Sequence, residues 1–285
     1  MKKHLAESSE QDEPLQTPAD PREQHPGPVA RTAPSSAEDD SRASSRAYAP
    51  PSAVDRELGA DYAEVLVAHH DRGSQVTEEY RGLRTSLLAQ NPEERFCYMI
   101  TSGDPGEGKT VTCANLGVVL AERADRTTLL VDFDLRKGRL AELLHADHKP
   151  GVAELLQGQA KLEDIVQRTA YPNLFFIPCG SSLRHEVGEI AGDARLEALV
   201  NEMRATYDFV LFDTPPMNVV SDAAALGRVI GKTLVVVRME KTERDSAEKA
   251  IRLIHAVNGE VAGLVLTARK RGLNNYRYYR YKYYR

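Results

Sequence analysis

The stretch Ser102-Gly103-Asp104-Pro105-Gly106-Glu107-Gly108-Lys109-Thr110 contains the pattern G-x-x-x-x-G-K-[ST], which is typical of a phosphate-binding loop. An apolar run at 96–100 precedes it and a helical pattern at 112–122 follows it, which is the strand–loop–helix context that the pattern requires. The glycines allow backbone N–H groups to surround phosphate oxygens, and the N-terminus of a helix adds partial positive charge. The stretch, called the phosphate loop below, therefore predicts a nucleoside triphosphate site.

Two side chains of the phosphate loop have predicted chemical roles. Lys109 is expected to reach the β- and γ-phosphates, and the Thr110 hydroxyl is expected to hold Mg²⁺. A glycine-rich turn with an accidental lysine is the alternative, and the flanking strand and helix argue against it. ATP and Mg²⁺ are the expected cofactors, and the predicted nucleotide-binding residues are Gly103, Asp104, Pro105, Gly106, Glu107, Gly108, Lys109, Thr110 and Val111.

Composition divides the chain into three parts. Residues 1–75 are rich in Pro, Ser and acidic side chains and carry a net charge of −6, so we predict a disordered arm that cannot bury a core. Residues 76–268 carry dense apolar runs, also at −6, and suffice for one domain. Residues 269–285 are basic and tyrosine-rich, with a net charge of +7.

Compartment and redox state follow from what the sequence lacks. No stretch approaches the roughly 18 apolar residues that span a bilayer, and the first residues lack the apolar run of a signal peptide. We therefore expect a cytoplasmic protein whose membrane association is peripheral or depends on a partner. Cys97, Cys113 and Cys179 are far apart and form no C-x-x-C, so we expect reduced, buried thiols.

Strand and helix patterns alternate along residues 76–268. Continuous apolar runs indicate strands that are buried on both faces, hence a mainly parallel sheet covered by helices: a doubly wound α/β domain. The segment 162–168 is predicted as helix or loop, and Thr242 is predicted to begin a capping box for the last helix. Strands are predicted at 96–100, 127–132, 174–178, 209–212, 233–238 and 261–267, and helices at 77–88, 112–122, 140–145, 152–157, 194–206, 221–228 and 242–257.

Acidic residues end two of these strands. The period of a strand places Asp132 and Asp134 on one side, and ligands in this fold class bind at the carboxyl ends of strands. Phosphoryl transfer to a hydroxyl needs Mg²⁺ at the phosphates and a carboxylate that accepts the proton. Asp213 ends an apolar strand, which is the Walker B arrangement, and is expected to bind Mg²⁺ directly or through water. A surface pair of aspartates is the alternative for Asp132 and Asp134.

The C-terminal tail has three competing interpretations. Interleaved aromatic and basic residues could stack on and neutralise single-stranded nucleic acid. The same mixture could lie on an anionic membrane. The tyrosines could instead accept phosphate from the nucleotide site. Packing on a partner protein is a fourth alternative. The acceptor interpretation explains most, because it accounts for tyrosines in particular, namely Tyr276, Tyr278, Tyr279, Tyr281, Tyr283 and Tyr284.

Taken together, residues 76–285 resemble the bacterial tyrosine kinases (BY-kinases) of capsular and exopolysaccharide assembly, which are P-loop NTPases related to MinD and ParA. The resemblance rests on the phosphate loop, on 131–136 as Walker A′, on 212–216 as Walker B and on the tyrosine tail. It implies that Asp132 is the catalytic base beside Mg²⁺, with Asp134 and Asp213 completing the metal shell and Lys109 and Thr110 holding phosphates and Mg²⁺.

The resemblance also implies partners. Glu78, Arg81 and Arg84 match the family's E-x-x-R-x-x-R segment, which implies ring-like self-association; alone they would be the solvated face of a helix. A membrane-protein activator acting in trans, a tyrosine phosphatase and further protein substrates are implied, with recruitment to the inner face of the cell membrane. Thr267 stands where the family commonly has Asn, which suggests a weaker preference for adenine.

The sequence thus predicts an ATP-dependent protein-tyrosine autokinase. It is expected to phosphorylate its tyrosine cluster in trans and to regulate capsular or exopolysaccharide synthesis and export. The alternative is a MinD/ParA-like ATPase whose tail anchors it to a membrane or nucleic acid. Asp104 argues against that alternative, because that family carries a lysine at this position. A non-catalytic scaffold that presents the tail is a third hypothesis, and nucleic acid is not an expected partner.

Overall fold

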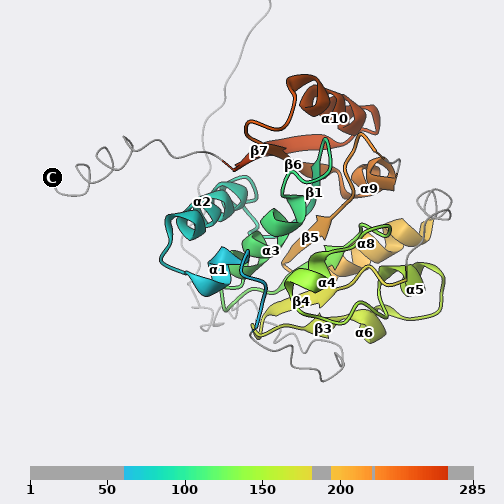
Figure 1. Ribbon diagram of the computed structural model, residues 1–285. Helices are drawn as coiled ribbons and strands as arrows, with labels where there is room; N and C mark the ends of the chain where they lie inside the picture. Colours follow the sequence, from blue (N-terminus) through green and yellow to red (C-terminus); the bar gives the residue numbers. More distant parts are fainter. Residues whose placement is uncertain (1–60, 182–193, 220–221, 269–285) are drawn as a thin grey trace, which may run out of the picture. The chain divides into compact units, whose positions relative to one another are not determined.

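The computed structural model describes residues 61–181, 194–219 and 222–268 (Figure 1). The predictions for residues 1–60 and for the tail, including its six tyrosines, lie outside the described residues. Within these ranges, no helix combines the length and the apolar character needed to cross a membrane.

The described residues form a seven-stranded sheet in the order β3-β4-β2-β5-β1-β6-β7. Every neighbouring pair is parallel except β3 and β4. The predicted doubly wound α/β fold is therefore confirmed, with one antiparallel edge strand that the sequence pattern did not reveal. The strands are β1 (Phe96–Ser102), β2 (Thr128–Asp132), β3 (Gln167–Arg168), β4 (Leu174–Ile177), β5 (Phe209–Asp213), β6 (Lys232–Arg238) and β7 (Glu260–Thr267).

Helices cover both faces of the sheet (Figure 1). Helix α3 packs on β1, β2 and β5, and α1, α2 and α4 pack in turn on α3. Helices α8, α9 and α10 contact β5, β1, β6 and β7. The helices are α1 (Val67–His70), α2 (Gln75–Ala89), α3 (Lys109–Leu120), α4 (Leu140–Leu143), α5 (Val152–Leu156), α6 (Leu162–Ile165), α8 (Ala194–Thr206), α9 (Asp222–Ile230) and α10 (Arg244–Ala256).

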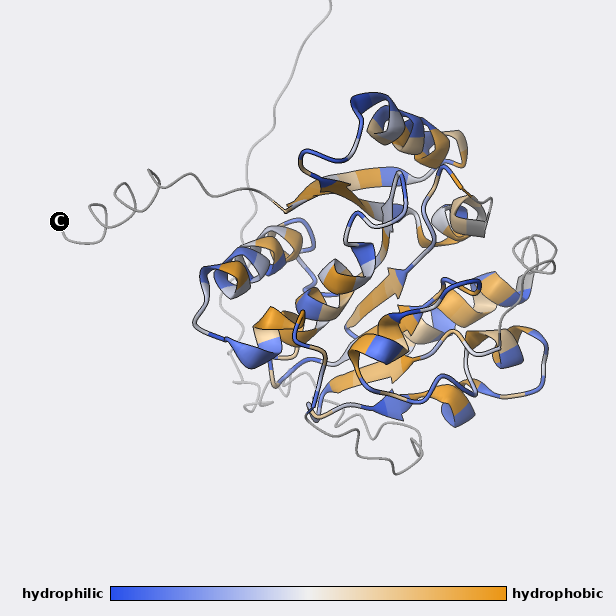
Figure 2. Cartoon of the chain, viewed as in Figure 1, coloured by the Kyte–Doolittle hydropathy of each residue, from blue (hydrophilic) through white to orange (hydrophobic). Residues whose placement is uncertain are grey.

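The central strands are buried along their whole length, as continuous apolar runs predict. In β1, Tyr98 and Ile100 belong to the core cluster beneath α3, whereas Met99 lies against Gly227 of α9. Successive side chains of one strand thus enter two different apolar layers. Figure 2 shows the same pattern, with apolar strands between helices whose apolar sides turn toward the sheet.

The predicted domain start at residue 76 is wrong. Tyr62, Leu66 and Ala68 are buried in the core, and the segment is held by Asn115 of α3. The Ala68 N–H donates to Asn115 Oδ1 over 2.9 Å, and Asn115 Nδ2 donates to the Val65 carbonyl over 3.1 Å. A few apolar side chains in a polar stretch are enough here because a buried amide on another element supplies the backbone hydrogen bonds.

The predicted capping box at Thr242 is also wrong. Helix α10 begins at Arg244 with Glu243 as N-cap and without a side-chain cap. The Thr242 hydroxyl accepts a hydrogen bond from the Arg238 N–H over 2.9 Å and also contacts the Glu107 carboxylate. The Thr242 side chain therefore holds the turn after β6 and contacts the phosphate loop, and it does not cap α10.

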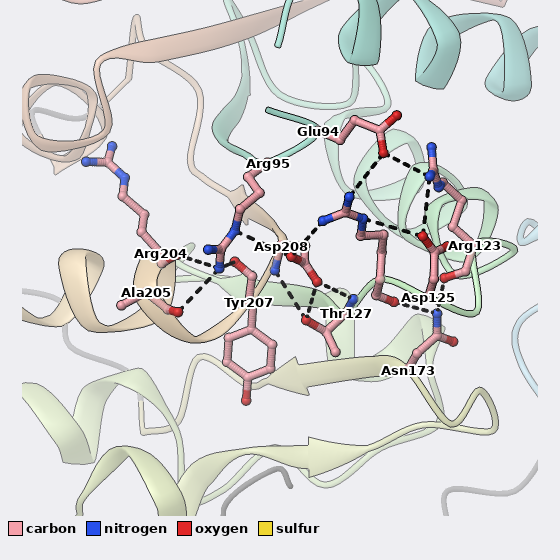
Figure 3. Close-up of polar contacts among 11 residues, drawn as sticks. Glu94, Arg95, Arg123, Asp125, Thr127, Asn173, Arg204, Ala205, Tyr207 and Asp208 are labelled. Atoms are coloured by element: carbon pink, nitrogen blue, oxygen red, sulfur yellow. Dashed lines mark hydrogen bonds and ion pairs between the residues drawn. The ribbon is translucent and has the colours of Figure 1, made fainter. Parts of the chain in front are cut away.

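A polar cluster joins the amino ends of the strands (Figure 3). Asp208, just before β5, accepts from the N–H and hydroxyl of Thr127, just before β2, over 2.9 and 3.0 Å. Its other oxygen lies 3.4 Å from both Arg95 and Arg126. Asn173, just before β4, donates to the carbonyls of Ala121, Arg123 and Arg126. We call Arg95, Arg126, Thr127, Asn173 and Asp208 the amino-edge cluster.

Candidate active site

The phosphate loop connects β1 to α3 at the carboxyl edge of the sheet. Gly106 and Gly108 have φ values of +78° and +100°, a backbone conformation that favours glycine. Gly108 is the N-cap of α3. Lys109, Thr110 and Val111 therefore form the first turn of that helix, and residues 103–108 form the loop in front of it. The local structure is the one that the motif predicted.

Lys109 lies among the predicted carboxylates. Its Nζ atom is 3.3 Å from Asp134 Oδ2 and 3.6 Å from Asp213 Oδ1, and it also reaches the Thr110 hydroxyl over 3.4 Å. Asp213 is the register partner of Asp132 on the neighbouring strand. The structure therefore brings the four predicted metal residues and the lysine to one edge of the sheet.

Asp132 is completely buried and is anchored by backbone donors. Its Oδ1 accepts from the Asp134 N–H over 3.2 Å, and its Oδ2 accepts from the Leu140 N–H at the start of α4 over 2.9 Å. Strand β2 ends at Asp132, so Asp134 reaches Lys109 from the turn beyond the strand. The sequence predicted that Asp132 and Asp134 lie together. Asp134 reaches the site because of this turn, however, and not because side chains alternate along a strand.

Asp213 differs from Asp132 and Asp134 because its side chain accepts no hydrogen bond from the described residues. Both carboxylate oxygens are buried, and neither has a hydrogen-bond partner among the described residues. Buried charged groups of this kind are costly unless they are paired or coordinate a metal. Lys109 provides an ion pair without hydrogen-bond contact, so the Asp213 oxygens retain the capacity to bind a cation.

Burial and mutual charge control the titration of this site. Burial, followed by the charge of Asp213, raises the pKa of Asp132 well above its ordinary value. Burial also raises the pKa of Asp213, although the Lys109 ammonium opposes the increase. Burial alone would lower the pKa of Lys109, but Asp213, Asp134 and Asp132 raise it above its ordinary value. Lys109 is thus a permanent cation within an acidic edge.

The residues present fit Mg²⁺ bound together with a nucleotide. Among the described residues, no group of three or more His, Cys, Asp or Glu side chains is arranged to hold a metal alone. Mg²⁺ in phosphate-transferring proteins takes only one or two carboxylates, and phosphates and waters complete its shell. The free oxygens of Asp213 and the nearby Thr110 hydroxyl supply donors of that chemistry.

The outer side of the phosphate loop makes contacts that sequence reasoning missed. Asp104 Oδ2 contacts the Ser246 hydroxyl of α10, and Ser246 is held by Asn218 Nδ2 over 2.9 Å. The Thr267 hydroxyl donates to the Glu107 carbonyl over 2.7 Å. Thr267 therefore holds the phosphate loop itself. The contacts of Asp104 and Glu107 join residues more than 100 positions apart. The clue available from the sequence was that Asn218, Ser246 and Thr267 lie at or after the ends of strands β5, β6 and β7.

The residues predicted for self-association make contacts within the chain. Arg81 pairs with Glu122, two residues beyond α3, through two guanidinium nitrogens, and it also contacts Glu78. Arg84 donates to the Val119 carbonyl over 2.7 Å and to Glu122 over 2.8 Å. This arrangement fastens α2 to α3. Self-association through Glu78, Arg81 and Arg84 stays a prediction.

The sequence of this chain is similar to those of bacterial tyrosine-protein kinases. Residues 99–261 match the family model described as an AAA domain. The putative tyrosine-protein kinase EpsB of Ralstonia nicotianae is 36% identical over 225 residues, which are 77% of this chain but 30% of that relative. The tyrosine-protein kinase YwqD of Bacillus subtilis is 31% identical over 219 residues, 76% of this chain and 92% of that relative.

Solved structures agree with the sequences. The kinase domain of the Escherichia coli tyrosine kinase ETK has a TM-score of 0.68 and 27% identity, covering 77% of this chain and 86% of that one. The chimerical protein CapA2B2 has a TM-score of 0.67 and 29% identity, covering 74% and 93%. MinD of Pyrococcus horikoshii, solved with Mg-ADP, has a TM-score of 0.52 and 27% identity, covering 60% and 69%.

Proposed function

This chain belongs to the bacterial tyrosine-protein kinase family, and on that premise we propose that it is an ATP-dependent protein-tyrosine autokinase. The observation that carries the proposal is the meeting of Lys109 with Asp132, Asp134 and Asp213 at the phosphate loop. Nucleotide binding is implied by membership of the P-loop family. Mg²⁺ and the tyrosine acceptor belong to the proposal.

The proposed reaction transfers the γ-phosphoryl group of ATP to a tyrosine hydroxyl. The tyrosine oxygen forms a bond to phosphorus while the bond from phosphorus to the β–γ bridging oxygen breaks, which yields phosphotyrosine and ADP. Asp132 accepts the phenolic proton, a role that suits a carboxylate whose pKa is raised by burial. Bound Mg²⁺ would neutralise developing charge on the phosphates, held by Thr110 and Asp213 with Asp132 and Asp134 nearby.

Lys109 has a second task in this scheme. In the described structure its ammonium group is paired with Asp134 and Asp213. Bound phosphates offer a stronger partner, so Lys109 would turn toward them and release both carboxylates for Mg²⁺. Binding of Mg²⁺ and binding of nucleotide are therefore expected to support each other.

The proposed acceptors are Tyr276, Tyr278, Tyr279, Tyr281, Tyr283 and Tyr284 of a neighbouring copy. Each phosphate adds about −1.5 to −2 charge, so four or more phosphates would cancel or reverse the +7 charge of residues 269–285. We further propose a role in capsular or exopolysaccharide synthesis and export at the inner face of the cell membrane. The likeness to the chimerical protein CapA2B2 supports a kinase that works with a second polypeptide, which we propose is a membrane activator. A tyrosine phosphatase would remove the phosphates from the tail.

The test is autophosphorylation of protein that has first been treated with a tyrosine phosphatase. After incubation with Mg·ATP, mass spectrometry is expected to find phosphate on the tail tyrosines of the wild type and none in Lys109→Met. Mixing full-length Lys109→Met with a wild-type chain that ends at residue 268 tests transfer in trans, because only the inactive copy then carries acceptors. Phosphate on that copy supports the proposal.

A MinD-like ATPase is the second candidate, favoured by the likeness to MinD. It predicts that the protein hydrolyses ATP while its tyrosines stay bare, even with the activator present. Asp104, which contacts Ser246, argues against it, because the MinD family carries its signature lysine at this position.

A further inference from the structure

Three consecutive carbonyl groups of the phosphate loop are held from outside by side chains. Lys241 Nζ donates to the Pro105 carbonyl over 2.9 Å and to the Gly106 carbonyl over 3.3 Å. An Arg238 guanidinium nitrogen donates to the same Gly106 carbonyl over 3.0 Å. The Thr267 hydroxyl donates to the next carbonyl, that of Glu107, over 2.7 Å.

These contacts fix the direction of three peptide N–H groups. A trans peptide is planar, and its N–H points opposite to its C=O. The carbonyl groups of Pro105, Gly106 and Glu107 share their peptide planes with the N–H groups of Gly106, Glu107 and Gly108. Because the carbonyls point outward to donors, the N–H groups of the same planes point to the other side of the loop. Successive N–H groups turned to one side form an anion-binding concavity.

The three donor residues lie at or just after the carboxyl ends of β6 and β7, which are neighbours in the sheet. Arg238 ends β6, Lys241 lies in the turn before α10, and Thr267 ends β7. The turn closes on itself through hydrogen bonds from the N–H groups of Lys241 and Thr242 to the Arg238 carbonyl, over 3.2 and 2.9 Å. The Met239 N–H donates to the Thr267 carbonyl over 3.0 Å and joins the turn to β7.

We propose that Arg238, Lys241 and Thr267 are positioning residues for the nucleotide, which hold the phosphate loop with its N–H groups turned toward the phosphates before ATP arrives. Without these donors the glycine-rich peptides can rotate, because Gly106 has no side chain that restricts them. The loop would then lose part of its binding free energy in reordering. The inference rests on the proposed function only in that the phosphate loop binds a nucleotide.

The test measures nucleotide affinity rather than kinase activity, so a failed kinase assay leaves it interpretable. Dissociation constants for a fluorescent ADP are compared in Lys241→Met, Arg238→Gln and the double variant, with Lys249→Met as control. Lys249 is exposed on α10 and has the same charge. We expect each single variant to weaken binding about two- to tenfold, the effect of losing one or two hydrogen bonds, with a larger loss in the double variant and no loss in the control.

Two further measurements separate positioning from simple charge attraction. Amide hydrogen exchange at Gly106 and Glu107 in the nucleotide-free protein should accelerate in the double variant. Lys241→Gln, which keeps a donor but no charge, should recover part of the affinity that Lys241→Met loses. Unchanged affinity in the double variant overturns the proposal. So does weakened affinity with unchanged amide exchange, because the cations would then bind the nucleotide directly.

Discussion

Asp213 combines full burial with two oxygens that have no hydrogen-bond partner among the described residues. Its pKa is raised chiefly by burial. A carboxyl with a raised pKa binds its proton more tightly in the folded state, so its stabilising contribution is present below the unfolded pKa, near 3.9. That contribution is lost as the pH rises through the folded pKa. At neutral pH the charged side chain therefore opposes folding of the nucleotide-free protein.

Asp213→Asn should consequently stabilise the nucleotide-free protein while it weakens binding of Mg·ADP. We expect the Tm in EDTA to rise by about 2–6 °C at pH 8, because a buried charge without hydrogen-bond donors is removed while Lys109 keeps Asp134 as its partner. The advantage should shrink toward pH 4.5. Scanning calorimetry over this range checks the prediction, with Glu93→Gln, at an exposed position, as control. A variant less stable than the wild type at pH 8 would contradict it.

The three thiols should be inert in the folded protein. All are buried, and burial raises the pKa of Cys97 to about 11 and that of Cys179 to about 12. Thiolates are the reactive form, so at pH 8 an aromatic disulfide reagent should label the native protein very slowly. In guanidinium chloride it should label three thiols. Cys179 and the carboxylate of Asp132 both lie against Gly138. Rapid labelling of Cys179, located by peptide mapping, would therefore mean that the chain around Asp132 opens readily.

The position of a site residue was predictable from the sequence where that residue ends a strand. Asp132 and Asp213 follow buried apolar runs, and ligands bind at the carboxyl ends of parallel strands, so the sequence alone predicted that the two residues lie together. Arg238 and Lys241 could not be found in this way. They lie on neighbouring strand ends too, but a cation in a turn after a strand is common, and only the folded chain shows that carbonyl groups lie opposite.

At the scale of elements, α2 is fastened to the helix that begins at Lys109. Glu122 receives Arg81 and Arg84 together, and the charge-assisted hydrogen bonds, that from Arg81 first, lower the pKa of Glu122. Helix α2 is therefore mechanically connected to the phosphate loop through α3. Any self-association through α2 would act on the same arginines.

Glu122→Gln distinguishes two roles of Arg81 and Arg84, namely the attachment of α2 to α3 and self-association. We expect a loss of about 0.5–1.5 kcal/mol in unfolding free energy, since two partly exposed ion pairs are removed. Urea denaturation measures this, with the exposed Glu202→Gln on α8 as control. If the arginines also mediate self-association, Arg81→Ala with Arg84→Ala should dissociate oligomers in sedimentation experiments. Glu122→Gln should then leave those oligomers intact.

Long elements were easier to predict than short ones. The buried strands and the helix after the phosphate loop follow their apolar patterns within a few residues. The two-residue strand β3 has too few residues to show a period, and α1 lies in a stretch whose composition is polar overall. Both are fixed by contacts with distant residues, such as the hydrogen bond from Ala68 to Asn115 over 2.9 Å, and therefore leave little trace in local sequence.

At the scale of the whole molecule, the two edges of the sheet differ in how their buried or half-buried aspartates are hydrogen-bonded. In the amino-edge cluster, Asp208 has both backbone and side-chain donors and two arginine partners. At the carboxyl edge, by contrast, neither side-chain oxygen of Asp213 has a hydrogen-bond donor among the described residues. Stability is concentrated at one edge and nucleotide chemistry at the other.

Asp208→Ala should therefore reduce stability without altering the chemistry. We expect a loss of about 2–3 kcal/mol, because Thr127 loses its acceptor and Arg95 and Arg126 lose a charged partner. Asp208→Asn, which keeps an acceptor for Thr127, should lose less. Denaturation curves check the order, and nucleotide affinity at 20 °C should equal that of the wild type in both variants. A changed affinity would show that the two edges are coupled.

The strand order has a further consequence for how the protein is made. Strands β1 and β2, which lead to the phosphate loop and Asp132, do not touch, because β5 lies between them. A growing polypeptide that has not passed position 209 contains both motifs but lacks the strand that joins them. Such non-local pairing forms late in folding. Asp132, Asp213 and the phosphate loop are thus expected to come together in one step, when β5 inserts, so that a chain ending before residue 209 has no nucleotide site.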